Sequence, residues 1–320
     1  MKKQFIVLIA VTSVFLTSCL KDEIPVPQHN PGDVILNSYE MGTDYRYNAY
    51  YDFETNTFVK EHLKTDWDLG FETGILGWRI VLNNSKAMNA GASPISDFEM
   101  VSDTMGVVWK SDASSWNLDT TAIGDWRDFP AVYCIDRGFS FDGTHLGYKK
   151  LEIESVNSDF YAIRYSNLDG SDEITTEVPK NDDNFNFSFF SFDSNDVASI
   201  EPEKESWDLV FRQYTHTFDD GISYLVNGVL SNSHEVEVAE IFHKEFEDVQ
   251  FEDINTVAFS SDIDVIGYDW KTFNGADFDI HPEQVYIVKT TEGLFYKLRF
   301  VDFYNAQGEK GTPTFEMQAL

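Results

Sequence analysis

The residues best suited to chemistry in this sequence are its histidines, because a neutral imidazole nitrogen is a common metal ligand. Two of them on opposite faces of a planar metal complex would give a six-coordinate centre. Residues 45–185 contain His62 and His145. The histidines in the second half are His216, His234, His243 and His281. A loop histidine without a ligand is the alternative for each of them.

Motifs of enzymes are absent from the sequence. It contains no Gly-x-Ser-x-Gly, no His-Glu-x-x-His, no phosphate-binding loop and no Gly-x-Gly-x-x-Gly. Pairs of carboxylates are uninformative, because 55 Asp and Glu residues bring some pairs together by accident. The acidic runs at residues 169–173 and 181–184 lack the spacing of a calcium loop, so we interpret them as solvated turns. We predict a binding protein without catalysis and without a protein-bound metal site.

The beginning of the chain has the pattern of an export signal followed by a lipid attachment site. Two lysines precede an uncharged run at residues 5–16, which is too short for a membrane-spanning helix. The sequence Leu-Thr-Ser-Cys ending at Cys19 resembles the bacterial lipobox, in which the cysteine is acylated. We predict a signal peptide at residues 1–18, an N-terminal lipid on Cys19 and a proline-containing tether at residues 19–44. An ordinary signal peptide with a chance cysteine is the alternative.

Composition excludes several classes of partner. The formal net charge of −32 argues against binding to nucleic acid, because phosphate recognition requires a basic surface. Apart from Cys19, the only cysteine is Cys134, so no intramolecular disulfide can form and an apolar core must hold the fold. Cys134 lies between Tyr133 and Ile135, which favours a buried small hydrophobe over a nucleophile.

The elements that must position these residues are predicted to be β-strands. Short segments alternate apolar and polar residues, which places one face in a core and one in water. Turn-like groups such as Asn167–Gly170 separate them, and strong helix candidates are absent. We therefore expect an all-β fold of antiparallel sheets, as a sandwich or a partly open barrel. The alternating segments are residues 148–153, 160–165, 185–192, 285–289 and 295–303.

Segments of the first half recur in the same order in the second half. The clearest match is Asp-Trp-Asp-Leu-Gly-Phe ending at Phe71 with Ser-Trp-Asp-Leu-Val-Phe ending at Phe211. On a strand, Trp, Leu and Phe of this motif would enter the core together, and the Asp would accept neighbouring N–H groups. Spacing also matches Asn83 with Asn227. We predict two tandem copies of one β-domain, at residues 45–185 and 186–320.

These segments together resemble the HmuY-like lipoproteins of Bacteroidetes. The resemblance rests on the Phe-x-Phe strand at residues 190–192, the Trp-Asp-Leu-x-Phe strand that follows it, and the final segments from Tyr286 to Phe315. The acidic residues after Cys19 also look like the export tag that such lipoproteins carry to the outer face of the outer membrane. The duplication departs from the single-domain pattern of the family.

The resemblance implies a function. The founding members capture haem at the cell surface through a pair of side chains and pass it to a TonB-dependent receptor. Applied here, it implies a surface lipoprotein of the outer membrane that binds haem non-covalently, since Cys-x-x-Cys-His is absent. His281, paired with either His234 or His243, is the ligand set that the resemblance favours.

Two other kinds of binding remain open from the sequence. Exposed tryptophans could stack on sugar rings of a cell-surface glycan, with Trp78, Trp109 and Trp116 as candidates. Alternatively, the β-domains could bind only another protein. The acidic charge does not discriminate between these alternatives and haem.

Overall fold

The computed structural model describes residues 32–127, 130–180 and 183–320, and the predicted all-β fold is confirmed within them. These residues form β-strands and short 3₁₀ helices, with no α-helix among them. No helix in this part of the chain has the length and apolar character needed to cross a membrane. Cys19 and the predicted signal peptide lie outside the described residues. The 3₁₀ helices are η1 (Asn84–Lys86), η2 (Phe98–Met100), η3 (Leu118–Thr120), η4 (Phe246–Asp248) and η5 (Phe251–Asn255).

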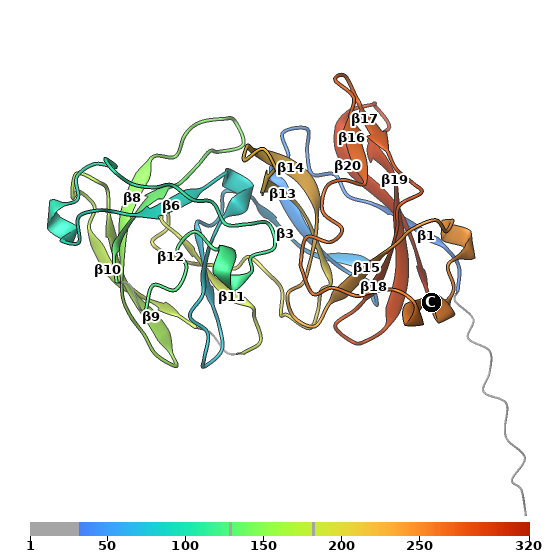
Figure 1. Cartoon of the computed structure of the whole chain (residues 1–320), viewed down its shortest axis with the longest axis horizontal. Coiled ribbons are helices and arrows are strands. Elements are labelled where there is room, and N and C mark those ends of the chain that lie inside the picture. The colour runs from blue at the N-terminus through green and yellow to red at the C-terminus, as the bar shows by residue number, and fades with distance from the viewer. Residues whose placement is uncertain (1–31, 128–129, 181–182) are drawn as a thin grey trace, which may run out of the picture. The chain divides into compact units, whose positions relative to one another are not determined.

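The first of two lobes is a sandwich of two antiparallel sheets (Figure 1). Side chains from both sheets share one core, in which the rings of Phe71 and Tyr161 lie 5.0 Å apart. The larger sheet contains, in spatial order, β10 (Ile174–Pro179), β9 (Phe160–Ser166), β8 (Tyr148–Val156), β7 (Val132–Asp136) and β6 (Asn89–Ala92). The smaller sheet contains β12 (Asp196–Ala198), β11 (Phe187–Ser191), β4 (Leu69–Glu72) and β5 (Ile80–Leu82).

The second lobe repeats this plan and adds a short hairpin. Its core is also shared between two sheets, and the rings of Phe211 and Phe315 stack there at 5.2 Å. The larger sheet contains β1 (Ile35–Ser38), β20 (Lys310–Ala319), β19 (Phe295–Tyr304), β18 (Val285–Lys289) and β15 (Glu237–Ile241). The smaller sheet contains β14 (Ser223–Ser231), β13 (Leu209–Thr217), β2 (Tyr47–Asp52) and β3 (Thr57–Leu63). The added hairpin consists of β16 (Lys271–Phe273) and β17 (Phe278–Ile280).

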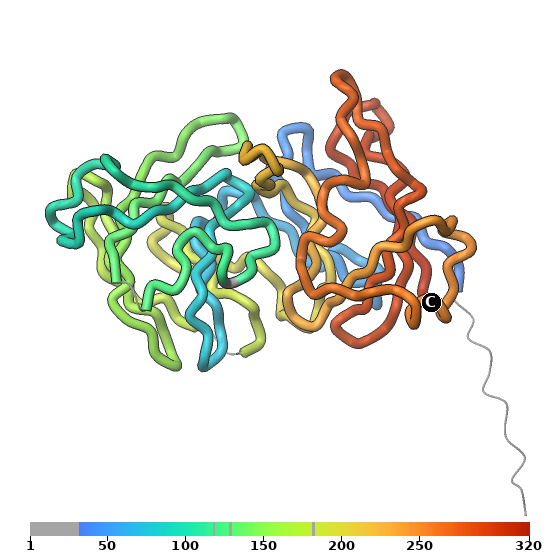
Figure 2. The backbone as a smooth tube through the Cα atoms, viewed as in Figure 1, coloured from blue at the N-terminus to red at the C-terminus, as the bar shows by residue number. Residues whose placement is uncertain are grey.

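Each lobe is completed by a hairpin from the other half of the sequence. β2 pairs with β13, and β11 pairs with β4, both in antiparallel register. The segment of β2 and β3, blue in Figure 2, therefore lies against β13, which follows β2 by about half of the chain. The division into residues 45–185 and 186–320 stays a prediction about the sequence repeat, and the hydrogen-bonded sheets cross it.

The Trp-Asp-Leu-x-Phe segments behave partly as predicted. Leu69 and Phe71 are buried in the core of the first lobe, but Trp67 lies in a separate cluster with Trp207. The reason is that β4 begins only at Leu69, so the alternation of a strand does not extend back to the tryptophan. The predicted role of the intervening carboxylate is confirmed, because Asp68 Oδ2 accepts a hydrogen bond from the backbone N–H of Phe192 at 2.8 Å.

Hydrogen bonds show which positions correspond between the lobes. The Asn83 side-chain amide donates to the carbonyl oxygen of Trp67 at 2.8 Å, and the Asn232 amide donates to that of Trp207 at 2.8 Å. These contacts relate Asn83 to Asn232, whereas sequence spacing related it to Asn227. Insertion of a longer β13–β14 hairpin in the second lobe accounts for the difference.

Candidate functional site

The described residues form a large aromatic cleft in the second lobe. It has a volume of about 780 Å³ and lies between the β13–β14 hairpin and the β16–β17 hairpin. This volume is within the usual range for a small-molecule or cofactor site. We call it the aromatic cleft, and its aromatic lining residues are Tyr45, Phe218, Tyr224, Tyr268, Phe273 and Phe278. Tyr224 is 58% exposed and Phe273 is 57% exposed, so their rings are free to contact a ligand.

The two hairpins present this lining because of their local pairing. β13 and β14 pair with each other well beyond the part of β13 that pairs with β2, and their last pairs include His216 with Tyr224. In the other hairpin, Phe273 pairs with Phe278, and their rings lie 5.3 Å apart. Aromatic residues opposite each other on paired strands stabilise such hairpins, and here they also create an apolar wall.

Two histidines flank the aromatic cleft. The His216 ring lies 4.8 Å from the ring of Tyr268 and 4.9 Å from that of Phe218, both of which line the cleft. His281 Nε2 lies 2.8 Å from the hydroxyl of Thr272, another lining residue. Both imidazoles remain partly exposed.

A carboxylate and a lysine complete the floor of the cleft. Burial raises the pKa of Asp269, whereas its own backbone N–H, Lys271, His216 and His281 lower it. The Lys271 ammonium is buried, donates to the carbonyl of Asn227 at 2.5 Å and lies 3.8 Å from the centre of the Trp270 ring.

The environment of Lys271 disfavours the charged form of its side chain. Burial lowers its pKa well below the usual range, and the charge of Asp269 acts in the opposite direction. Neither Asp nor Glu forms an ion pair with Lys271 among the described residues. Lys310 also lines the cleft, with its ammonium 5.5 Å from the centre of the Tyr45 ring. Lys310 thus offers an ammonium group to an acidic ligand, and a carboxylate bound near Lys271 would favour the charged form of that amine.

The structure places the histidines of the predicted ligand set in different surroundings. His281 lies beside the aromatic cleft, but the known contacts of His234 and His243 do not include its lining residues. His234 follows β14, where its backbone N–H donates to Asn232 Oδ1 at 3.0 Å. His243 is exposed in a left-handed backbone conformation after β15. The sequence listed His216 among the histidines but did not predict its position beside the cleft, because the contact of a long hairpin with a loop near Tyr268 has no local sequence signal.

His62 on β3 of the second lobe and His145 in the first lobe are engaged in other contacts. His62 is buried, its Nδ1 lies 2.8 Å from the Leu63 carbonyl, and burial lowers its pKa to about 3. His145 Nε2 lies 2.8 Å from Asp136. The first lobe has a smaller cavity of about 520 Å³ between residues 72–79 and Asp183, and its lining contains no histidine among the described residues.

Comparison with known proteins identifies the family. The model of the HmuY protein family matches residues 44–317, and this chain belongs to that family. The crystal structure of apo PinO from Porphyromonas gingivitis is 10% identical, with 90% of this chain and 98% of that chain covered and a TM-score of 0.31. The apo HmuY analog from Tannerella forsythia is also 10% identical, with 91% and 98% covered and a TM-score of 0.25. No curated protein matches the sequence.

Proposed function

We propose that this protein binds haem, or a closely related tetrapyrrole, in the aromatic cleft of the second lobe. The observation that carries the proposal is the combination of a cleft of about 780 Å³ lined by six aromatic rings with two histidines that contact its lining residues. A porphyrin has broad aromatic faces, an iron atom that takes imidazole ligands, and two carboxylates. The aromatic rings, His216 with His281, and the amino groups of Lys271 and Lys310 match these three features.

We further propose that the protein works as a lipid-anchored carrier on the outer surface of the outer membrane. Acylation of Cys19 would hold the folded part near a TonB-dependent receptor and raise its local concentration there. The working step is capture and release of haem, without a catalysed reaction. This part of the proposal rests on the lipobox and on membership of the HmuY family. Co-purification of the receptor with the lipidated protein, lost in Cys19→Ala, would test it.

A haemin titration of the full chain tests the binding site. We expect a saturable Soret band with low-spin features at micromolar haemin, lost in His216→Ala and in His281→Ala. His145→Ala serves as the matched control in the first lobe, and its spectrum should equal that of the wild type. If His234→Ala or His243→Ala removes the low-spin features while His216→Ala does not, the original pairing with His281 is right and His216 is not a ligand. A featureless titration refutes haem binding.

The glycan alternative has narrower support. Trp116 is only 8% exposed, so it cannot stack on a sugar ring. Trp109 is 36% exposed, and its ring lies 5.9 Å from that of Tyr148 on the first lobe. Binding on a glycan array, abolished by Trp109→Ala and unaffected by haemin, would favour this second function.

A further inference from the structure

Three carboxylates converge at the base of the second lobe, away from the lining of the aromatic cleft. They belong to Asp52, Glu54 and Asp208, and one oxygen of each lies within 4.8 Å of the others. Asp52 is 7% exposed and Asp208 is 0% exposed. Burial of several carboxylates together is costly unless a cation or protons compensate their charge.

The described residues supply hydrogen bonds to this cluster but no cation. Asp208 accepts from the backbone N–H groups of Phe53 at 3.0 Å and Thr291 at 3.1 Å. Glu54 Oε1 accepts from the Thr290 hydroxyl at 2.6 Å. Glu54 Oε2 is shielded from solvent and has no hydrogen-bond partner among the described residues.

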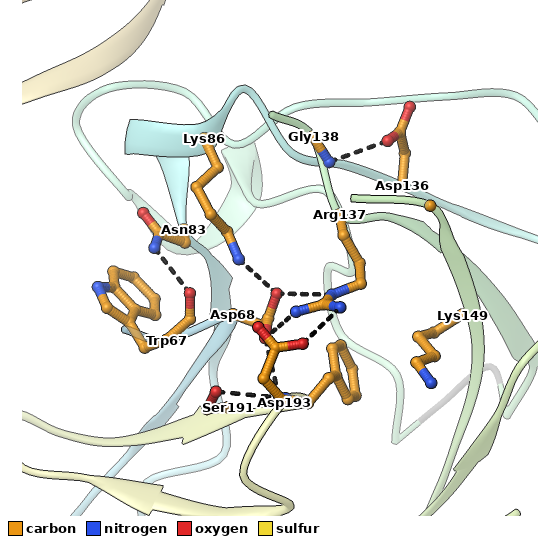
Figure 3. Close-up of polar contacts among 12 residues, drawn as sticks. Trp67, Asp68, Asn83, Lys86, Asp136, Arg137, Gly138, Lys149, Ser191 and Asp193 are labelled. Atoms are coloured by element: carbon orange, nitrogen blue, oxygen red, sulfur yellow. Dashed lines mark hydrogen bonds and ion pairs between the residues drawn. The ribbon is translucent and has the colours of Figure 1, made fainter. Parts of the chain in front are cut away.

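The first lobe contains the corresponding site with its charges balanced. Asp68 corresponds to Asp208, because each accepts through Oδ2 the backbone N–H of a phenylalanine that follows a paired strand. Figure 3 shows Lys86 and Arg137 both directed at the Asp68 carboxylate. Arg137 also pairs with Asp193 at 2.9 Å.

The two cationic residues of the first lobe have no cationic counterparts at the corresponding positions of the second lobe. β7 and β18 have the same place in their sheets and similar sequences, Val-Tyr-Cys-Ile and Val-Tyr-Ile-Val. Thr290 directly follows β18, as Arg137 directly follows β7, and its hydroxyl contacts Glu54 as Arg137 contacts Asp193. The second lobe therefore has the neutral Thr290 at the position that Arg137 occupies in the first lobe.

The other two changes deepen the deficit of positive charge. Asp52 ends β2 at the position where the neutral Ser191 ends β11. The counterpart of Lys86 would lie in the turn after Asn232, and no lysine occurs there. The first lobe thus has two anions and two cations at this corner, whereas the second lobe has three anions and no cation among the described residues.

We propose that a divalent metal ion, with Ca²⁺ as the best match, binds between Asp52, Glu54 and Asp208. Calcium takes carboxylate oxygens at about 2.3–2.6 Å, so two ligand oxygens around it are separated by up to about 5 Å. The 4.8 Å spread of the three oxygens fits this geometry. The site joins the turn after β2, the start of β13 and the turn after β18, three segments far apart in the sequence. The ion takes the place of the two cations of the first lobe and links the β2–β3 hairpin to the rest of the second lobe.

Terbium luminescence and thermal unfolding of the full chain test the proposal. Tyr296 is a built-in sensitiser, because its ring stacks at 4.8 Å on Phe53, the residue between Asp52 and Glu54. We expect saturable Tb³⁺ emission on tyrosine excitation, displaced by Ca²⁺ with a dissociation constant on the order of 10⁻⁴ to 10⁻³ M. At Ca²⁺ far above this value, the melting temperature should rise by about 5 °C over that in EDTA.

Matched variants assign the response to this corner. Glu54→Gln should abolish the emission and the calcium shift, while Asp193→Asn, the corresponding change in the first lobe, should retain both. Thr290→Arg, which restores the arginine of the first lobe, should raise the melting temperature in EDTA and remove the calcium shift. Absence of emission and of a calcium shift in the wild type, or their retention in a folded Glu54→Gln, would overturn the proposal. None of these outcomes depends on haem binding.

Discussion

Replacing the carboxylate by an amide should change the free energy of unfolding very differently at Asp68 and at Asp208. In Asp68→Asn, two buried cations lose their shared counter-ion. Arg137 donates to Asp68 at 3.0 and 3.1 Å, Lys86 forms a further ion pair with it, and Asp68 is fully buried. Breaking a buried ion pair from one side costs about 3–5 kcal/mol. For a chain of this size, that corresponds to a fall of roughly 10 °C in melting temperature.

Asp208→Asn removes one of three mutually repelling carboxylates and leaves no cation unpaired. In EDTA at pH 7 we therefore expect a change within about 1 kcal/mol of zero, or a small gain in the free energy of unfolding. The assay is thermal unfolding followed by near-UV circular dichroism, with both variants measured in the same buffer. An equal loss of stability in the two variants would refute the charge argument, because hydrogen bonds alone would then explain both sites.

Three further predictions concern the frame around the sites. Lys150→Met and Lys297→Met each remove a buried ammonium that donates to a 3₁₀-helix carbonyl at 2.8 Å, and urea unfolding should show a loss of about 1–3 kcal/mol in each. Burial lowers the pKa of His62 to about 3, so the free energy of unfolding should fall by about 1.4 kcal/mol for each pH unit below about 6.5 through this residue. Urea unfolding of His62→Gln at several pH values should lack this contribution. An unchanged pH dependence in the variant would contradict the burial argument. Gly228→Ala would place a methyl group 2.2 Å from the carbonyl oxygen of Gly267, and a melting temperature equal to that of the wild type would show that this loop moves easily.

Local sequence patterns were sufficient for the kind of element and for some hydrogen bonds. Alternation of apolar and polar residues depends only on the two-residue period of a strand, so the strands around residues 160–165 and 285–289 were predictable. The acceptor role of Asp68 was also predictable, because an Asp beside a paired strand meets free N–H groups. Membership of the HmuY family followed from the same short segments.

Other features depend on which strands pair, and strand pairing joins residues that are distant in sequence. The exchange of hairpins between the lobes, the placement of His216 beside a cleft with His281, and the separation of His234 and His243 from its lining had no local signal. The same limit applied to Asn83, whose counterpart was fixed by a hydrogen bond to a tryptophan carbonyl and not by spacing.

The sequence by itself determined that the chain is all-β and strongly acidic, and it predicts an export and lipidation signal ending at Cys19. The tertiary structure alone decided which charges meet. Asp68 and Asp208 stand in nearly identical sequence contexts, yet one is surrounded by two cations and the other by two carboxylates. The physical reason is that electrostatic energy depends on distances between side chains, and those distances are set by the pairing of strands from both halves of the chain.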